Sequence, residues 1–259
     1  MRSPPSPARS FLIDSLQVHV YPDRHGMGAA AAYAVATQMG AAIERRGSAT
    51  VVFAAAPSQD DFLAALATLP DIDWDSVVAF HMDEYLGLPE DAPQGFGSFL
   101  RERLFDLVEI GTVHYLDGQA VNPEDECQRY GSLLEAHQVD VVCAGIGENG
   151  HLAFNDPSDT DFSDWRRVRV VELEHMSRQQ QVHDGCFEAL DEVPTHALTL
   201  TIPALMAAEQ IHTIVPGPTK AEAVRRTLKG SIGTECPATA LRQHCHSILY
   251  LDRDSAALV

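Results

Sequence analysis

Short apolar runs rich in Val, Ile and Phe alternate along the chain with longer amphipathic stretches. This alternation is typical of a parallel β-sheet covered by helices. The apolar runs predict strands at Leu16–Tyr21, Thr50–Ala54, Val77–His81, Thr112–Tyr115, Val139–Ala144, Val168–Leu173, Ala197–Thr201, Ile211–Val215 and Ile248–Leu251. The amphipathic stretches predict helices at Gly26–Arg46, Ser58–Leu69, Phe96–Val108, Pro123–His137 and Lys220–Leu228, with one more between the strands at Val168–Leu173 and Ala197–Thr201.

Proline falls at or between the ends of these elements, and no internal repeat or low-complexity linker divides the chain. We therefore expect one α/β domain over residues 11–259, with a Rossmann-like, open and mostly parallel sheet and helices on both faces. Residues 1–10 contain Pro4, Pro5 and Pro7 but no apolar run, which predicts a disordered N-terminal tail.

The charge balance narrows the range of partners. Lys and Arg number 18 against 37 Asp and Glu, a formal net charge of −19. This charge repels nucleic-acid backbones and anionic lipid, so we expect neither as a partner, whereas a small anionic metabolite can still bind where a few cations and N–H groups converge. No stretch resembles a membrane span or the apolar part of a signal peptide. The five cysteines show no CxxC spacing, so we expect reduced thiols, a cytoplasmic protein and no metal site.

In open α/β sheets, ligands bind outside the carboxyl ends of the strands. Four segments of the chain occupy such positions, namely Ala54–Ser58, His81–Tyr85, Gly145–Asp156 and Pro216–Lys220. The sequence therefore predicts that catalytic and binding residues come from these segments.

The segment from Gly145 to Pro157 follows a predicted buried strand and places three glycines before one histidine, His151. Glycine lets the backbone approach a ligand closely and adopt positive φ. Asp156, a few residues further on, can orient the imidazole, and a histidine held by a carboxylate suits general acid–base chemistry near neutral pH. The pattern alone is equally compatible with an ordinary glycine-rich loop that carries a surface histidine.

Asp83 comes almost directly after the predicted strand Val77–His81. A carboxylate at the carboxyl end of a parallel strand can face a substrate, and partial burial raises its pKa towards that of a useful base. A carboxylate in this position can also cap the following turn, so the motif by itself is a weak indication of catalysis.

Two further segments are candidate anion sites. After Ala54, a turn of small residues leads into a helix whose free N–H groups suit an anion, although Asp60 and Asp61 in its first turn oppose one. Lys220 follows another strand and turn, where its ammonium can meet a phosphate. An ordinary capped helix and an exposed lysine are the alternative interpretations.

Four segments in this order resemble the glucosamine-6-phosphate deaminase/isomerase family, which is sister to the 6-phosphogluconolactonases. They are Phe80–Pro89 (FHMDEYLGLP), Gly145–Pro157 (GIGENGHLAFNDP), Val193–Thr199 (VPTHALT) and Gly217–Ala221 (GPTKA). The likeness covers nearly the whole chain. The combination of MDEY-x-GL with GHLAFN is specific to the deaminases, because the lactonases lack the AFN continuation.

The resemblance implies roles for five residues. Asp83 would move a proton between C2 and C1 of the open-chain sugar, and His151 would assist ring opening. Asp156 stands where the family usually has a Glu that orients the histidine, and Asn149 where members have Asp or Asn. Lys220 matches the phosphate-binding lysine. The implied reaction needs no cofactor, and members of the family commonly form homo-oligomers.

The expected phosphate pocket departs from the family pattern. A Gly-Gly-Thr-Pro loop is replaced by Ala55, Ala56, Pro57 and Ser58, followed by Gln59. Alanine adopts positive φ less readily than glycine, and proline has no N–H. A phosphate-binding Arg of the family aligns with His183, and an imidazole binds an anion more weakly and in a pH-dependent way. The implied substrate-binding residues are Ala55, Ala56, Ser58, Gln59, His183 and Lys220.

We therefore predict an enzyme of amino-sugar catabolism that isomerises and deaminates glucosamine 6-phosphate to fructose 6-phosphate and ammonia. One alternative is another sugar-phosphate enzyme on the same fold, either a galactosamine-6-phosphate deaminase/isomerase or a 6-phosphogluconolactonase-like hydrolase. The other is a catalytically silent module that binds sugar phosphates. The joint presence of Asp83 and His151 favours an enzyme, because binding alone needs no base opposite a histidine.

Overall fold

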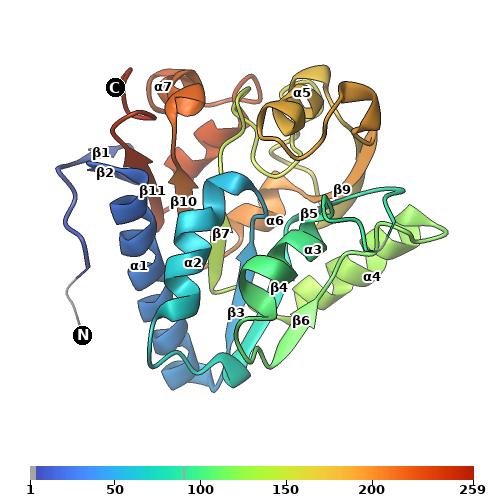
Figure 1. Ribbon diagram of the computed structural model, residues 1–259, viewed down its shortest axis with the longest axis horizontal. Helices are drawn as coiled ribbons and strands as arrows, with labels where there is room; N and C mark the ends of the chain where they lie inside the picture. Colours follow the sequence, from blue (N-terminus) through green and yellow to red (C-terminus); the bar gives the residue numbers. More distant parts are fainter. Residues whose placement is uncertain (1–3, 90) are drawn as a thin grey trace.

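The computed structural model describes residues 4–89 and 91–259. Within them, eight strands form the main sheet (Figure 1), in the spatial order β1 (Arg9–Ile13), β2 (Leu16–Tyr21), β11 (Ser247–Asp252), β10 (Gln210–Val215), β7 (Val141–Ala144), β3 (Ala49–Phe53), β4 (Val77–His81) and β6 (Thr112–His114). β1 pairs antiparallel with β2, and every other pair of neighbours in this sheet is parallel. The predicted α/β fold with an open, mostly parallel sheet is confirmed.

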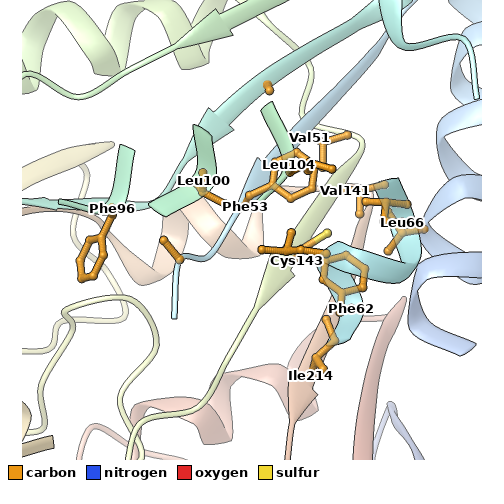
Figure 2. Close-up of a cluster of buried hydrophobic side chains, with 14 of the residues drawn as sticks. Val51, Phe53, Phe62, Leu66, Phe96, Leu100, Leu104, Val141, Cys143 and Ile214 are labelled. Carbon is orange, nitrogen blue, oxygen red and sulfur yellow. The ribbon is translucent and has the colours of Figure 1, made fainter. Parts of the chain in front are cut away.

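Helices cover both faces of the main sheet (Figure 1). One face carries α1 (Arg24–Arg46), α2 (Asp60–Thr68) and α3 (Phe96–Leu100), and the other carries α4 (Pro123–Ala136), α6 (Ile202–Met206) and α7 (Ala221–Lys229). Side chains of successive strand residues alternate between these layers: Val51 and Phe53 of β3 pack on the first, and Val52 on the second. Figure 2 shows the first layer, with Phe62 of α2 near Cys143 of β7. Burial on both faces explains why these strands are continuous apolar runs.

Local signals set the helix boundaries. Asp23 accepts the N–H of Gly26 at 2.7 Å at the start of α1, and Gly47 ends that helix in the left-handed region with a φ of 82°. Asn122 caps α4 in the same way as Asp23 caps α1. The predicted helix Phe96–Val108 is shorter than expected, because α3 passes after Leu100 into a π-helical turn, Arg101–Phe105.

The strands predicted at Val168–Leu173 and Ala197–Thr201 exist but do not join the main sheet. β8 (Val168–Glu172) and β9 (His196–Leu200) pair antiparallel with each other, and β9 also pairs with β5 (Asp83–Tyr85). The helix α5 (His175–His183) lies between β8 and β9 in the chain. An apolar run predicts a strand without saying which sheet it joins, so the sequence did not reveal this second, three-stranded sheet.

Met82 connects the two sheets. Its N–H donates to the carbonyl of Phe53 in β3 at 3.2 Å, and its own carbonyl accepts the N–H of Leu200 in β9 at 2.8 Å. Asp83 therefore begins β5 where the chain leaves the main sheet.

The strand β1 begins inside the segment that we expected to be a disordered tail. Arg9 pairs with Val20 and Ser10 with His19, in a hairpin that turns after Ile13. The pairing of the hairpin extends β1 to Arg9 and Ser10. Both residues are polar, so a search for apolar runs does not find this end of the strand. Residues 1–3 of the expected tail lie outside the described residues.

Candidate active site

The strands β3, β4, β7 and β10 end at the same edge of the main sheet (Figure 1). The segments that follow them line a pocket. The four segments predicted from the sequence all contribute to it. Its walls include Ala54, Ala55, Ala56, Ser58, Met82, Asp83, Gly145, Gly147, His151, Phe154, Gln180, Gln181 and Lys220. The carboxyl ends of parallel strands thus bring together side chains that are far apart in the sequence.

Polar side chains hold His151 on its Nδ1 side. The Nδ1 atom lies 3.2 Å from Oδ1 of Asp156 and 3.0 Å from Oγ of Ser177. Asn149 accepts the backbone N–H of His151 at 3.0 Å and donates its own amide to Asp156 at 2.9 Å. Ser177 also donates a hydrogen bond to Asp156. The structure therefore brings together His151, Asp156 and Asn149, and adds Ser177 to them.

The charge of Asp156 determines which nitrogen of His151 carries the proton. Burial by itself would raise the pKa of Asp156, but hydrogen bonds from His151, Ser177 and Asn149 outweigh it and lower that pKa to about 2. The ionised carboxylate accepts hydrogen bonds, which assigns the proton of the neutral imidazole to Nδ1. The Nε2 atom is then free to accept a proton and return it, as general acid–base catalysis requires.

Two backbone positions in the loop shape the space around His151. A Cβ atom on Gly147 would lie 2.2 Å from both Cε1 and Nε2 of His151, so only glycine fits there. Ala153, which also lines the pocket, has a φ of 50°, in the left-handed region that a non-glycine residue rarely adopts. Backbone strain of this kind concentrates at functional sites.

The adjacent carboxylates of Asp83 and Glu84 have different surroundings. Glu84 accepts the N–H groups of Tyr85, Phe96 and Gly97 at 2.8 to 3.0 Å, and so holds the start of α3. Asp83 lines the pocket, and no side chain or backbone group in residues 4–89 and 91–259 forms a hydrogen bond with its carboxylate. Burial, and secondarily the charge of Glu84, raise the pKa of Asp83 well above its ordinary value. The capping role considered for this motif belongs to Glu84, and Asp83 faces the pocket.

A buried histidine supports the backbone of Asp83. His81 Nδ1 lies 2.9 Å from the carbonyl oxygen of Asp83, and His81 Nε2 accepts the N–H of Leu116 at 3.0 Å. Burial lowers the pKa of His81 to about 4, so the ring is neutral at physiological pH and donates from Nδ1. The hydroxyl of Tyr130 accepts the N–H of His81 at 2.9 Å. This network fixes the backbone from which the Asp83 carboxylate projects.

The pocket also contains a buried cation. Lys220 is 5% exposed and lines the pocket together with Ala55, Ala56 and Ser58. Burial lowers the pKa of the Lys220 ammonium, although the carboxylates of Asp184 and Glu148 oppose this. The ammonium and the Ser58 hydroxyl give the pocket donors that an anion needs.

Two predicted binding residues do not line this pocket. Gln59 is fully buried and donates its amide to the carbonyl of Ile214 and to Ser58, both at 3.1 Å, so it supports the loop from behind. His183 is about half-exposed, and its Nδ1 lies 3.5 Å from a carboxylate oxygen of Glu148. His183 is the last residue of α5, and the pocket is lined by another face of that helix.

The residues of α5 that reach the site are Ser177, Gln180 and Gln181, none of which we singled out from the sequence. They recur at spacings of three and four, as expected for one face of a helix. All three are buried although they are polar. A search for polar residues at helical spacing would have detected this face.

Among the described residues, no group of three or more His, Cys, Asp or Glu side chains is arranged to hold a metal ion. Over the same residues, no helix combines the length and the apolar character needed to cross a bilayer.

Comparison with known proteins agrees with this geometry. Residues 22–250 match the family described as glucosamine-6-phosphate isomerases/6-phosphogluconolactonase, so the chain belongs to that family. Within the family, the glucosamine-6-phosphate deaminases of Bacillus cytotoxicus and of Bacillus cereus strain B4264 are each 37% identical to the chain over 187 residues. The matched part is 72% of this chain and 70% of each of theirs.

Solved structures extend the comparison to nearly the whole chain. A monomeric glucosamine-6-phosphate deaminase superposes with a TM-score of 0.85 at 29% identity, covering 93% of this chain and 99% of the other. The 6-phosphogluconolactonase of Thermotoga maritima superposes with a TM-score of 0.74 at 21% identity, covering 92% of this chain and all of the other. The second likeness shows a common fold and nothing more.

Proposed function

We propose that the protein converts glucosamine 6-phosphate into fructose 6-phosphate and ammonia. The observation that carries the proposal is one pocket with three groups. They are the buried Asp83, whose carboxylate makes no hydrogen bond within residues 4–89 and 91–259, the carboxylate-oriented His151, and the buried cation Lys220. The relatives from Bacillus, which are glucosamine-6-phosphate deaminases, support the same assignment.

The reaction begins with opening of the pyranose ring, and His151 supplies the acid–base catalysis for this step. Its Nε2 takes a proton from the anomeric hydroxyl and returns one to the ring oxygen, while Asp156 holds Nδ1 and stabilises the transient imidazolium. The open chain carries an aldehyde at C1, which acidifies the proton on C2.

Asp83 then acts as the base. It removes the C2 proton while O1 takes up a proton from the C2 ammonium of the substrate, which forms an enolamine. It then returns the first proton to C1, which leaves a protonated imine at C2. Water adds to the imine and ammonia departs, so that C2 becomes the ketone of fructose 6-phosphate. Because burial raises its pKa, the Asp83 carboxylate is a stronger base than an ordinary aspartate.

The phosphate of the substrate would bind at the other end of the pocket. Lys220 supplies a positive charge, and Ser58, Ala55 and Ala56 line the same pocket. An ammonium within a buried site attracts a phosphate more strongly than an exposed one, because less water screens the interaction.

We propose a cytoplasmic location, which is consistent with free thiols at Cys127, Cys143, Cys186, Cys236 and Cys245. Assembly into a homo-oligomer stays a prediction from the family resemblance, and sedimentation velocity over a range of concentrations would test it.

Release of ammonia tests the proposed function. Wild type and Asp83→Asn are compared on glucosamine 6-phosphate, galactosamine 6-phosphate and unphosphorylated glucosamine. We expect turnover of the first by wild type and a loss of at least about 100-fold in kcat for the variant, because the amide cannot accept the C2 proton. Absence of ammonia from all three substrates would rule out a deaminase, and hydrolysis of 6-phosphogluconolactone would then identify the alternative enzyme class.

A further inference from the structure

The side-chain amide of Gln181 lines the pocket and makes no hydrogen bond within the described part of the chain. The residue is 7% exposed and lines the pocket. Across residues 4–89 and 91–259, no group forms a hydrogen bond with its side chain, whereas the neighbouring Gln180 bonds to the N–H of Glu148 and to Asp184. The amide is therefore available to a ligand that enters the pocket, where a hydrogen bond to the ligand would replace one to water.

The position of Gln181 along α5 indicates which part of a ligand it meets. Ser177 contacts His151, at the end of the pocket where ring opening would occur. Gln181 follows four residues later on the same face, about 6 Å further along the helix axis. Asp184 comes next after the helix and acts electrostatically on Lys220. Gln181 therefore lies on the side of the pocket nearer to the cation.

The charges at that end show why a neutral donor is useful. Lys220 is the cation among the described residues that line the pocket, and the carboxylates of Asp184 and Glu148 act on it. His183, which the alignment placed at the phosphate, is held by Glu148 instead. The two carboxylates weaken the attraction between this ammonium and a phosphate dianion, and uncharged N–H and O–H donors would strengthen phosphate binding.

We infer that Gln181 is a substrate-contacting residue whose amide N–H donates to a phosphate oxygen of the sugar phosphate. It takes the part of the family's phosphate-binding Arg, which aligns with His183, two residues further along α5. The inference rests on the proposed function for the identity of the substrate. It goes further in assigning phosphate recognition to a neutral hydrogen bond from α5.

Two variants test this contact. Gln181→Met keeps the length of the side chain and removes the N–H donor. Gln181→Glu replaces the donor with a negative charge, which repels the phosphate. Gln179→Met and Gln179→Glu are matched controls, because Gln179 lies on the same helix and does not line the pocket. For each protein, kcat and KM for glucosamine 6-phosphate are measured together with the inhibition constant of inorganic phosphate.

For Gln181→Met we expect KM and the phosphate inhibition constant to rise together by about tenfold, the value of one hydrogen bond to a charged group. For Gln181→Glu we expect a larger rise in both, with kcat changed less than either, and the Gln179 variants should match wild type. An unchanged inhibition constant in both Gln181 variants would overturn the inference. A rise in KM without a rise in the inhibition constant would also overturn it, because the contact would then be to a sugar hydroxyl.

The binding readout separates this inference from the proposed function. Calorimetry with inorganic phosphate needs no turnover, so it measures the Gln181 contact even if wild type releases no ammonia. Tight phosphate binding by wild type that weakens in Gln181→Met supports the contact whatever reaction the pocket catalyses. Failure of wild type to bind phosphate would overturn it.

Discussion

Gly147 lies directly against the imidazole of His151, so close that a Cβ atom on residue 147 would be 2.2 Å from Nε2. This contact makes the glycine a requirement for the position of the ring rather than a source of loop flexibility. In Gly147→Ala the methyl group has to displace the imidazole from Asp156. We expect kcat/KM for ammonia release to fall about 100-fold, as a displacement of about 1 Å can cause.

Gly40→Ala is the matched control for this prediction. Gly40 lies within α1, and nothing lies within 4 Å of the Cβ that alanine would add there. We expect unchanged activity and a gain in stability of about 0.5–1 kcal/mol from the better helix former. Equal activity in the two alanine variants would contradict a positioning role for Gly147.

The acidic limb of the pH–activity profile should report the raised pKa of Asp83. A base must be ionised, so kcat/KM should fall as the pH drops through that pKa, above the range of an ordinary aspartate near 3.9. Glu84→Gln removes the neighbouring charge that contributes to the shift, so its acidic limb should move to lower pH. The exposed Glu102→Gln should leave the limb in place, and a limb unaffected by Glu84→Gln would argue against Asp83 as the base.

Asp156 should make folding stability dependent on pH. Its pKa in the folded protein is about 2, below the ordinary value of 3.8, so the stabilisation is present above the ordinary value and is lost as pH falls towards 2. The shift corresponds to about 2 kcal/mol. Urea denaturation at pH 6 and pH 3 should show a smaller difference for Asp156→Asn than for wild type. The exposed Asp106→Asn should retain the wild-type difference, and equal behaviour of the two variants would disprove the linkage.

The Nδ1 atom of His81 should be needed for full catalytic activity, because it bonds to the carbonyl of Asp83. In His81→Asn the side-chain amide can replace Nδ1 and still donate to the carbonyl of Asp83, whereas in His81→Gln the longer side chain replaces Nε2. We expect near-normal kcat in the Asn variant. In the Gln variant we expect kcat to fall about tenfold with little change in KM, because Asp83 loses its support. Equal loss of kcat in both variants, matched by equal loss of thermal stability, would indicate a packing role only.

The convergence of Asp83, His151 and Lys220 could be predicted from the sequence because it follows from strand direction. Parallel strands end at one edge of the sheet, so residues that follow different strands meet there. The separate environments of Asp83 and Glu84 could not be predicted in this way. Adjacent residues of a strand point to opposite faces. Because β5 is not evident from the sequence, the opposite directions of the Asp83 and Glu84 side chains could not be predicted.

The pocket face of α5 was missed for a different reason. Helix faces are found by the periodicity of apolar residues, and this face consists of Ser177, Gln180 and Gln181. The family resemblance points instead to His183, which lies on the exposed side of the helix. Buried polar residues break the usual link between hydropathy and burial, and such exceptions are expected at functional sites.

The double attachment of Met82 has a consequence for how substrate preference can change during evolution. His151 and Lys220 belong to loops of the large sheet, whereas α5 and its Gln181 lie between two strands of the small one. Met82 is hydrogen-bonded to both. Substitutions on the small sheet and α5 can therefore alter the recognition of a ligand while the buried eight-stranded framework, and the stability that it provides, stays intact. The protein thus has a part that provides stability and a part that can adapt, joined at the residue before Asp83, the proposed base.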